Sequence, residues 1–232
     1  VYFLLKKFDE ALLGYSFIIQ KTKDEDLLVK ASLGVAWAYA KLNNLNQAKI
    51  YFQNVVDLTN KSDVKVNALT QMADALSDAD KTAEALVIYD TIIKTYPDNV
   101  MMDYILHRQA IALLKVGKTQ AALNAFENLK DNFSTSRYLD DIDYYVGLAA
   151  FKKNNYKTAV AKMENYLKSN SRASGFMSEA NYVLAVSYLN LKQPEEALKL
   201  FQKILRLYPD DQNVARNSDI GIAKCQFQLG QI

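Results

Sequence analysis

The sequence predicts an all-α protein, a right-handed α-α superhelix of about six helix pairs that forms a single solenoid domain. Two observations carry this prediction. The first is a ladder of six alanines spaced 37, 37, 37, 37 and 38 residues apart, at Ala11, Ala48, Ala85, Ala122, Ala159 and Ala197. The second is composition, because seven glycines and three prolines in 232 residues leave little material for turns. Fixed periods of this size are typical of stacked units that each need their neighbours to bury an apolar face.

Each period is predicted to contain two helices. In the third unit, Leu69 and Leu76 share one face of a first helix, and Ala85 and Ile92 share one face of a second helix. A short polar break separates the two apolar blocks. Pro97 ends the pair, because a proline cannot continue a helix. Each unit is therefore expected to be one helix pair.

The same periodicity, followed along the chain, predicts twelve helices. Their ranges are 8–22, 27–42, 45–59, 63–79, 81–95, 99–116, 118–132, 137–153, 155–169, 175–191, 194–207 and 212–229. The approximate units are 1–25, 26–62, 63–99, 100–136, 137–174, 175–211 and 212–232, with truncated repeats at both ends. The chain is therefore expected to be a segment of a longer array.

Two further series predict how the helices pack. Small residues are expected where the first helices cross their neighbours, at Ala36, Ala73, Ala110, Gly147, Ala185 and Ala223. The residue four positions after each ladder alanine is expected to fill the space beside it; these residues are Tyr15, Phe52, Tyr89, Phe126, Met163 and Phe201. Both series are interpreted as core.

The unit from Ala180 to Asp210 resembles the tetratricopeptide repeat family most fully. Its matching positions are Ala180, Tyr182, Leu184, Ala185 and Tyr188 on the first helix, and Ala197, Phe201, Ile204 and Pro209 on the second helix and its terminator. The period of 37 residues is longer than the family's usual period of about 34. The tryptophan that is common early in the family's first helix is absent here. The resemblance extends over nearly the whole chain and implies a helical scaffold.

The phrase Tyr-Pro-Asp ends two of the repeats, at residues 96–98 and 208–210. Long repeats that end in this way are similar to those of bacterial envelope proteins. The likeness implies a periplasmic or outer-membrane-associated protein; otherwise the protein is expected to be cytoplasmic.

In this family the first helices line a concave groove, so the resemblance implies that partner-binding residues lie on them. The implied residues are Leu33, Trp37, Asp74, Tyr104, His107, Ile111, Tyr144, Leu148, Phe151, Tyr182, Val186, Leu189, Ile220 and Phe227. An apolar, aromatic groove suits an extended segment or a helix of a partner protein. Trp37 is the sharpest candidate, although packing between repeats would use the same side chain. Asp74 belongs to a polar, acidic stretch that either selects a basic or polar ligand feature or is simply solvated.

Composition and spacing argue against other functions. The 28 basic and 26 acidic residues give a net charge of +2 without a long basic run, which disfavours nucleic-acid binding. No apolar stretch of about 18 residues is present, so no membrane span is predicted. His107 and Cys225, each the only residue of its type, lie more than three repeats apart, so they are not expected to form a catalytic pair. The run Asp140, Asp141 and Asp143 is interpreted as a charge cluster at a helix N-terminus. No cofactor or metal site is predicted.

We therefore predict a non-catalytic scaffold that binds a peptide segment or a partner protein in its concave groove. The alternative is that this segment is the recognition or assembly arm of a larger enzyme or of an envelope or secretion machine. A third class, repeat recognition of RNA, needs polar base-reading positions and a basic groove, and the sequence has neither. Terminal repeats without caps are also expected to favour homo-oligomers through their exposed end faces.

Overall fold

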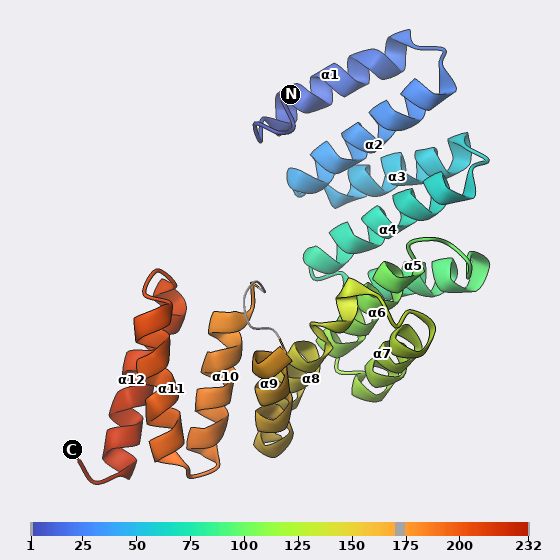
Figure 1. Cartoon of the computed structure of the whole chain (residues 1–232). Helices are drawn as coiled ribbons and strands as arrows, with labels where there is room; N and C mark the ends of the chain where they lie inside the picture. Colours follow the sequence, from blue (N-terminus) through green and yellow to red (C-terminus); the bar gives the residue numbers. More distant parts are fainter. Residues whose placement is uncertain (1, 170–174, 232) are drawn as a thin grey trace. The chain divides into compact units, whose positions relative to one another are not determined.

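The described part of the chain is built from α-helices (Figure 1) and contains one 3-10 turn. These elements come from a computed structural model that describes residues 2–169 and 175–231. Within the described residues there is no β-strand. Contacts divide the chain into two compact units, Val1–Phe133 and Ser134–Ile232, and successive helices pack against each other inside each unit. The predicted all-α array of helix pairs is therefore confirmed, while the single-domain boundary stays a prediction.

The first unit begins with α1, which corresponds to the second helix of a pair, and continues with three complete helix pairs. Its helices are α1 (Phe8–Lys21), α2 (Glu25–Lys41), α3 (Leu45–Leu58), α4 (Ser62–Asp78), α5 (Thr82–Thr95), α6 (Met102–Lys115) and α7 (Thr119–Asn132). The pairs are α2 with α3, α4 with α5, and α6 with α7. Apolar side chains from both helices of each pair are buried between them, as Val35, Val55, Leu76 and Ile92 show.

The second unit holds two complete helix pairs and ends with α12, which corresponds to the first helix of a pair. Its elements are the 3-10 turn η1 (Arg137–Leu139), α8 (Ile142–Lys152), α9 (Tyr156–Ser169), α10 (Met177–Asn190), α11 (Pro194–Leu207) and α12 (Gln212–Gln228). One core cluster joins α8, α9 and α10 through Tyr144, Met163 and Leu184. A second joins α10, α11 and α12 through Phe201 and Cys225.

Ten of the twelve predicted helices start within two residues of their observed starts, and local hydrogen bonds explain the two that do not. The helix α6 begins at Met102 rather than at Asn99, because the Asn99 side chain accepts a hydrogen bond from the backbone N–H two residues later at 3.0 Å. The helix α8 begins at Ile142 rather than at residue 137. There Ser136 Oγ accepts from the N–H two residues later at 3.2 Å and opens the 3-10 turn.

The alanine ladder lies in the core. All six ladder alanines are buried, with none more than 4% exposed. Five of the six filler residues are also buried, and Tyr15 is half-buried against Gly34 of α2. Of the small residues on the first helices, all are buried except Ala223. Ala223 is exposed, so its predicted burial is wrong. No second helix covers that side of α12 in the described part of the chain.

Each turn from a first helix to its second helix contains a residue in the left-handed region, and so do the turn before α1 and the turn after α12. These residues are Lys6, Asn43, Asp80, Gly117, Asn154, Lys192 and Gly230, with φ between 58° and 77°. They recur 37, 37, 37, 37, 38 and 38 residues apart. The N–H that follows each one donates to the carbonyl five residues before it, as from Asn44 to Tyr39 at 2.8 Å and from Gln193 to Tyr188 at 3.0 Å. This is the Schellman arrangement, which satisfies the last carbonyls of the first helix and reverses the chain.

Candidate functional site

The predicted groove residues lie on the first helices of both units. Leu33 and Trp37 are on α2, Asp74 on α4, Tyr104, His107 and Ile111 on α6, Tyr144, Leu148 and Phe151 on α8, Tyr182, Val186 and Leu189 on α10, and Ile220 and Phe227 on α12. His107, Tyr144 and Leu189 are buried. Ile220 and Phe227 are exposed, and the other nine residues are half-buried. Partial exposure therefore holds for most of the set but not for its three buried members.

Trp37 joins three helices of the first unit. Its indole Nε1 donates to Gln71 Oε1 of α4 at 2.5 Å. Its ring meets Phe52 of α3 edge-on at 6.0 Å, and Lys41 Nζ lies 5.5 Å from the ring centroid. The Gln71 amide nitrogen donates in turn to the side-chain carbonyl of Asn67. Much of the Trp37 side chain is thus used in packing between repeats.

Asp74 accepts three hydrogen bonds from neighbouring helices. Tyr104 Oη donates to Oδ2 at 2.6 Å, and Tyr89 Oη donates to Oδ1 at 2.5 Å. Arg108 Nε donates to Oδ1 at 2.7 Å, and the Asp74 side chain is only 14% exposed. Burial and the charge of Asp74 raise the pKa of Tyr89, which therefore stays a donor. The negative charge of Asp74 is neutralised inside the chain, so this carboxylate already has the cation that a basic ligand would supply.

Two of the buried groove residues have clear structural partners. The His107 ring lies 6.2 Å from that of Phe126, and burial, aided by the charge of Arg108, lowers the pKa of His107 to about 4. Tyr144 stacks on Phe176 at 4.4 Å, and its hydroxyl donates to Glu179 Oε2 at 2.6 Å. Both side chains therefore stabilise the core of their own unit.

One position recurs on the first helices at the same register as Trp37. It is held by Trp37, Asp74, Ile111, Leu148, Val186 and Lys224. In the first unit this position bonds to a side chain 34 residues later, Trp37 to Gln71 and Asp74 to Arg108. The matching residue for Val186, 35 residues later, is Gly221. Because glycine has no side chain, Gln71 and Arg108 of the first unit have no counterpart in the space between α10 and α12, and the Phe201 ring takes the place that a Cβ at Gly221 would occupy.

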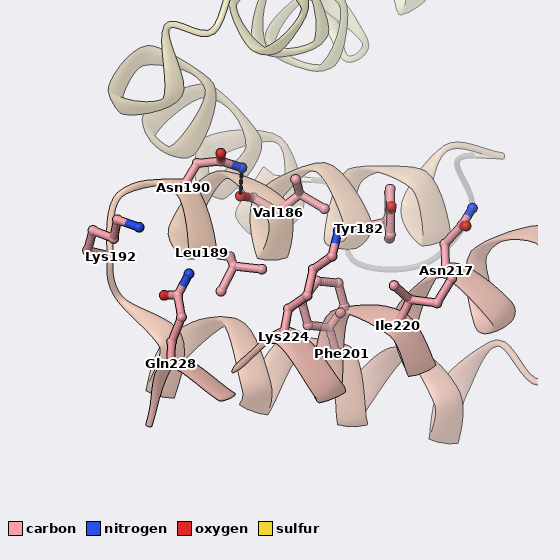
Figure 2. Close-up of a pocket in the computed structure, with 11 residues that line it drawn as sticks. Tyr182, Val186, Leu189, Asn190, Lys192, Phe201, Asn217, Ile220, Lys224 and Gln228 are labelled. Carbon is pink, nitrogen blue, oxygen red and sulfur yellow. Dashed lines mark hydrogen bonds between the residues drawn. The ribbon is translucent and has the colours of Figure 1, made fainter. Parts of the chain in front are cut away.

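A pocket of about 400 Å³ occupies this space in the second unit (Figure 2). Its apolar wall contains the predicted residues Tyr182, Val186, Leu189 and Ile220, with Phe201 of α11 behind them. Its polar residues are Asn190, Lys192, Asn217, Lys224 and Gln228. The sequence analysis missed all five polar residues. Lys224 could have been found from its register with Trp37 and Val186, whereas the others required the fold.

Gly221 and Phe201 set the depth of this pocket. A Cβ atom at Gly221 would lie 2.4 Å from Phe201 Cζ, so the ring occupies the place that a side chain would take. In Figure 2 the Phe201 ring lies between α10 and α12, beyond the side chain of Lys224. The Asn190 amide nitrogen donates to the Val186 carbonyl at 2.8 Å. The pocket therefore has an aromatic floor and a polar rim.

The aspartates at the start of α8 interact with neighbouring side chains of the same unit. Asp143 lies in the first turn of α8 and pairs with Lys162 Nζ at 2.8 Å. Burial, with the neighbouring charge of Asp140, raises the pKa of Asp141.

Over residues 2–169 and 175–231, no group of three or more His, Cys, Asp or Glu side chains is placed to hold a metal ion. None of the described helices is long and apolar enough to cross a membrane.

Family models match three parts of the chain. All three are described as tetratricopeptide repeat, and they match residues 29–62, 67–99 and 147–212. No curated protein matches the chain.

Several solved structures have a similar fold. A tetratricopeptide repeat protein from Parabacteroides merdae is 18% identical, with a TM-score of 0.64 over 87% of this chain and 73% of that one. BtubC from P. vanneervenii is 12% identical, with a TM-score of 0.71 over 86% of this chain and 90% of that one. YrrB, described as a tetratricopeptide repeat protein with an unusual peptide-binding site, is 15% identical, with a TM-score of 0.57 over 90% of this chain and all of that one. At these identities the likeness concerns the fold alone.

Proposed function

Because the chain belongs to the tetratricopeptide repeat family, we propose that its first helices bind a segment of a partner protein in their groove. The family and the fold support a protein-interaction scaffold. A peptide-binding site in the similarly folded YrrB is consistent with the finer proposal. The partner is a protein or peptide, bound without chemical change.

The pocket between α10 and α12 is the observation that carries the proposal. Four residues implied by the family resemblance, Tyr182, Val186, Leu189 and Ile220, line one cavity. A cavity between two helices with an apolar wall and a polar rim suits the side chains of an extended segment or of an amphipathic helix. Ile220 is half exposed before any partner binds, so its burial would contribute to affinity.

The first unit offers fewer free groups at the same register. Ile111 is half-buried, and Trp37 and Asp74 are bonded to the following first helix. We therefore propose the second unit as the main contact for the partner. Trp37 and Ile111 would add contacts for a partner that extends along the first unit.

Peptide selection tests this proposal. The chain is immobilised and used to select from a random dodecapeptide library, and the selected peptides are then labelled for fluorescence anisotropy. The variant Val186→Ala/Ile220→Ala should weaken their binding by about tenfold or more, because both side chains line the pocket. The matched control is Val87→Ala/Leu207→Ala, which removes exposed apolar side chains from second helices.

The control should bind as the unchanged chain does. If the control loses affinity while the pocket variant keeps it, the binding surface lies on the second helices and the groove proposal is wrong. Recovery of no binding peptide would also contradict it. The alternative, that this chain is the recognition or assembly arm of a larger enzyme or machine, stays a prediction and would use the same surface.

A further inference from the structure

We propose that the pocket between α10 and α12 selects acidic segments. An apolar side chain of the partner enters between the helices, and neighbouring Asp or Glu side chains pair with Lys192 and Lys224. This inference rests on the proposed function, since it specifies the chemistry of the segment that the first helices bind.

The charge around the pocket has one sign. Lys192 and Lys224 are the charged residues among the eleven that line it, and none of the eleven is Asp or Glu. Both lysines are exposed. Neither has an ion-pair partner among the described residues. A carboxylate brought to this rim would therefore gain Coulomb attraction without breaking an existing pair.

Lys224 differs from the residues at the same place on the other first helices. Ile111, Leu148 and Val186 are apolar there, and Trp37 is aromatic. Asp74 is charged, but Arg108 Nε at 2.7 Å compensates it. Among the described residues, Lys224 is thus the uncompensated charge at this register position. In Figure 2 its side chain rises from α12 toward α10, in front of the Phe201 ring.

The apolar side chain of the partner has a defined place in the pocket. Gly221 lets the Phe201 ring lie against α12, and this ring forms the bottom of the pocket between the two helices. Tyr182 and Ile220 provide apolar surface on opposite helices. The amides of Asn217 and Gln228 line the same pocket and can hydrogen-bond the partner's backbone. An apolar residue flanked by acids therefore matches both the floor and the rim.

Side-chain carboxylates fit this rim better than a chain terminus. Lys192 lies in the turn after α10, whereas Lys224 lies within α12. Two cations on different elements match a segment with more than one carboxylate, and a C-terminus supplies only one. The occupant is therefore an internal acidic segment of a partner protein.

The test uses the peptides selected by the chain. One selected peptide is prepared with an amidated C-terminus, with a free C-terminus, and with its Asp and Glu replaced by Asn and Gln. Affinities are measured by anisotropy for the unchanged chain and for Lys192→Gln/Lys224→Gln. The control is Lys157→Gln/Lys168→Gln, which removes two exposed lysines of α9.

We expect selected sequences enriched in Asp or Glu beside a large apolar residue. The pocket variant should bind the acidic peptide about 3- to 30-fold more weakly, and raising the salt concentration should reduce the difference. The control variant should bind unchanged. Amidation of the C-terminus should have no effect, and the Asn/Gln peptide should lose the sensitivity to Lys192 and Lys224.

Each contrary outcome has one meaning. Peptides that need Val186 and Ile220 but are neither acidic nor sensitive to the lysine variant would overturn this inference and leave the proposed function standing. Peptides that need a free C-terminus would also overturn it, in favour of terminal capture. Failure to recover any peptide that depends on Val186 and Ile220 would overturn both.

Discussion

Arg108 of α6 donates to Asp74 of α4 at 2.7 Å, across the same 34-residue separation that links Trp37 of α2 to Gln71 of α4. Both bonds join one first helix to the next. They differ in the free energy lost when one partner is removed, because the Asp74–Arg108 pair is charged and largely shielded from water. The side-chain exposures of Asp74 and Arg108 are 14% and 23%. Successive first helices in the first unit are therefore held by directional contacts as well as by apolar packing.

We expect Asp74→Asn to lower the free energy of unfolding by about 2–3 kcal/mol, because it removes the more buried of the two carboxylates that pair with Arg108 and leaves only the exposed Asp78, which lies 3.2 Å from the guanidinium. Urea unfolding followed by circular dichroism measures this change. Asp131→Asn, at an exposed site on α7, is the matched control and should change little. The double variant Asp74→Leu/Arg108→Met should recover part of the loss. Equal losses for the single and double variants would show that the pair itself is not the cause.

His107 should make stability depend on pH. Its pKa of about 4 in the folded chain lies below the ordinary value of 6.5, so the unfolded chain takes up the proton first as pH falls. The stabilisation is complete above about pH 6.5 and is lost as pH falls toward 4, by at most about 3 kcal/mol. Since the chain has one histidine, the difference in unfolding free energy between the unchanged chain and His107→Leu isolates this effect. Parallel pH profiles for the two would refute it.

We expect Gly221→Ala to reduce stability by about 1–3 kcal/mol, since the new Cβ would lie 2.4 Å from Phe201 Cζ. Gly14→Ala is a matched control in the interior of α1, where no other atom lies within 4 Å. That control should instead gain about 0.5–1 kcal/mol from helix propensity. Phe201→Leu should relieve part of the Gly221→Ala loss. The unfolding midpoints of Gly221→Ala, Gly14→Ala, Phe201→Leu and the double variant Gly221→Ala/Phe201→Leu test this prediction, and a Gly221→Ala chain as stable as the parent would contradict the packing described.

The left-handed turns predict opposite effects of two exchanges. Asp80→Gly should raise the free energy of unfolding by about 0.5–1 kcal/mol, because glycine adopts φ of 60° without strain. Gly117→Ala, at φ of 77° in the next such turn, should lower it by about 1–2 kcal/mol. Thermal unfolding of both variants checks the pair. The same sign for both would show that the turn conformation is not what limits stability there.

Exposed apolar side chains on the terminal helices keep the homo-oligomer prediction open to test. Phe227 of α12 is 74% exposed, and Leu13 and Phe17 of α1 are also exposed. We expect the apparent mass in light scattering to rise with concentration, and Phe227→Ser to reduce the rise. A constant monomer mass at high concentration would contradict this expectation.

The helix pairs could be predicted because the alanine ladder repeats in residue type as well as in position. The left-handed turns repeat just as regularly, but Lys, Asn, Asp and Gly all occupy them, so only the backbone reveals the series. The predicted burial of Ala223 failed for a different reason, because burial depends on which helix follows and not on the residue itself.

The candidate site was predictable in outline. Its apolar wall follows from the first-helix register, which selects Tyr182, Val186 and Leu189. The cavity itself depends on the position of the Phe201 ring against Gly221, and this position is not visible in one sequence. The pairing of Asp74 with Arg108 likewise needs two repeats to be superposed in space.

The recurring turns also define equivalent cut points in the chain. The segment 44–80 begins just after the left-handed Asn43 and ends on the left-handed Asp80, so it is one complete period in phase with the turns. A second copy of this segment inserted after Asp80 would meet a native turn at each junction and would present α4-type residues twice. Array length can therefore be altered by whole cassettes, independently of the pocket between α10 and α12.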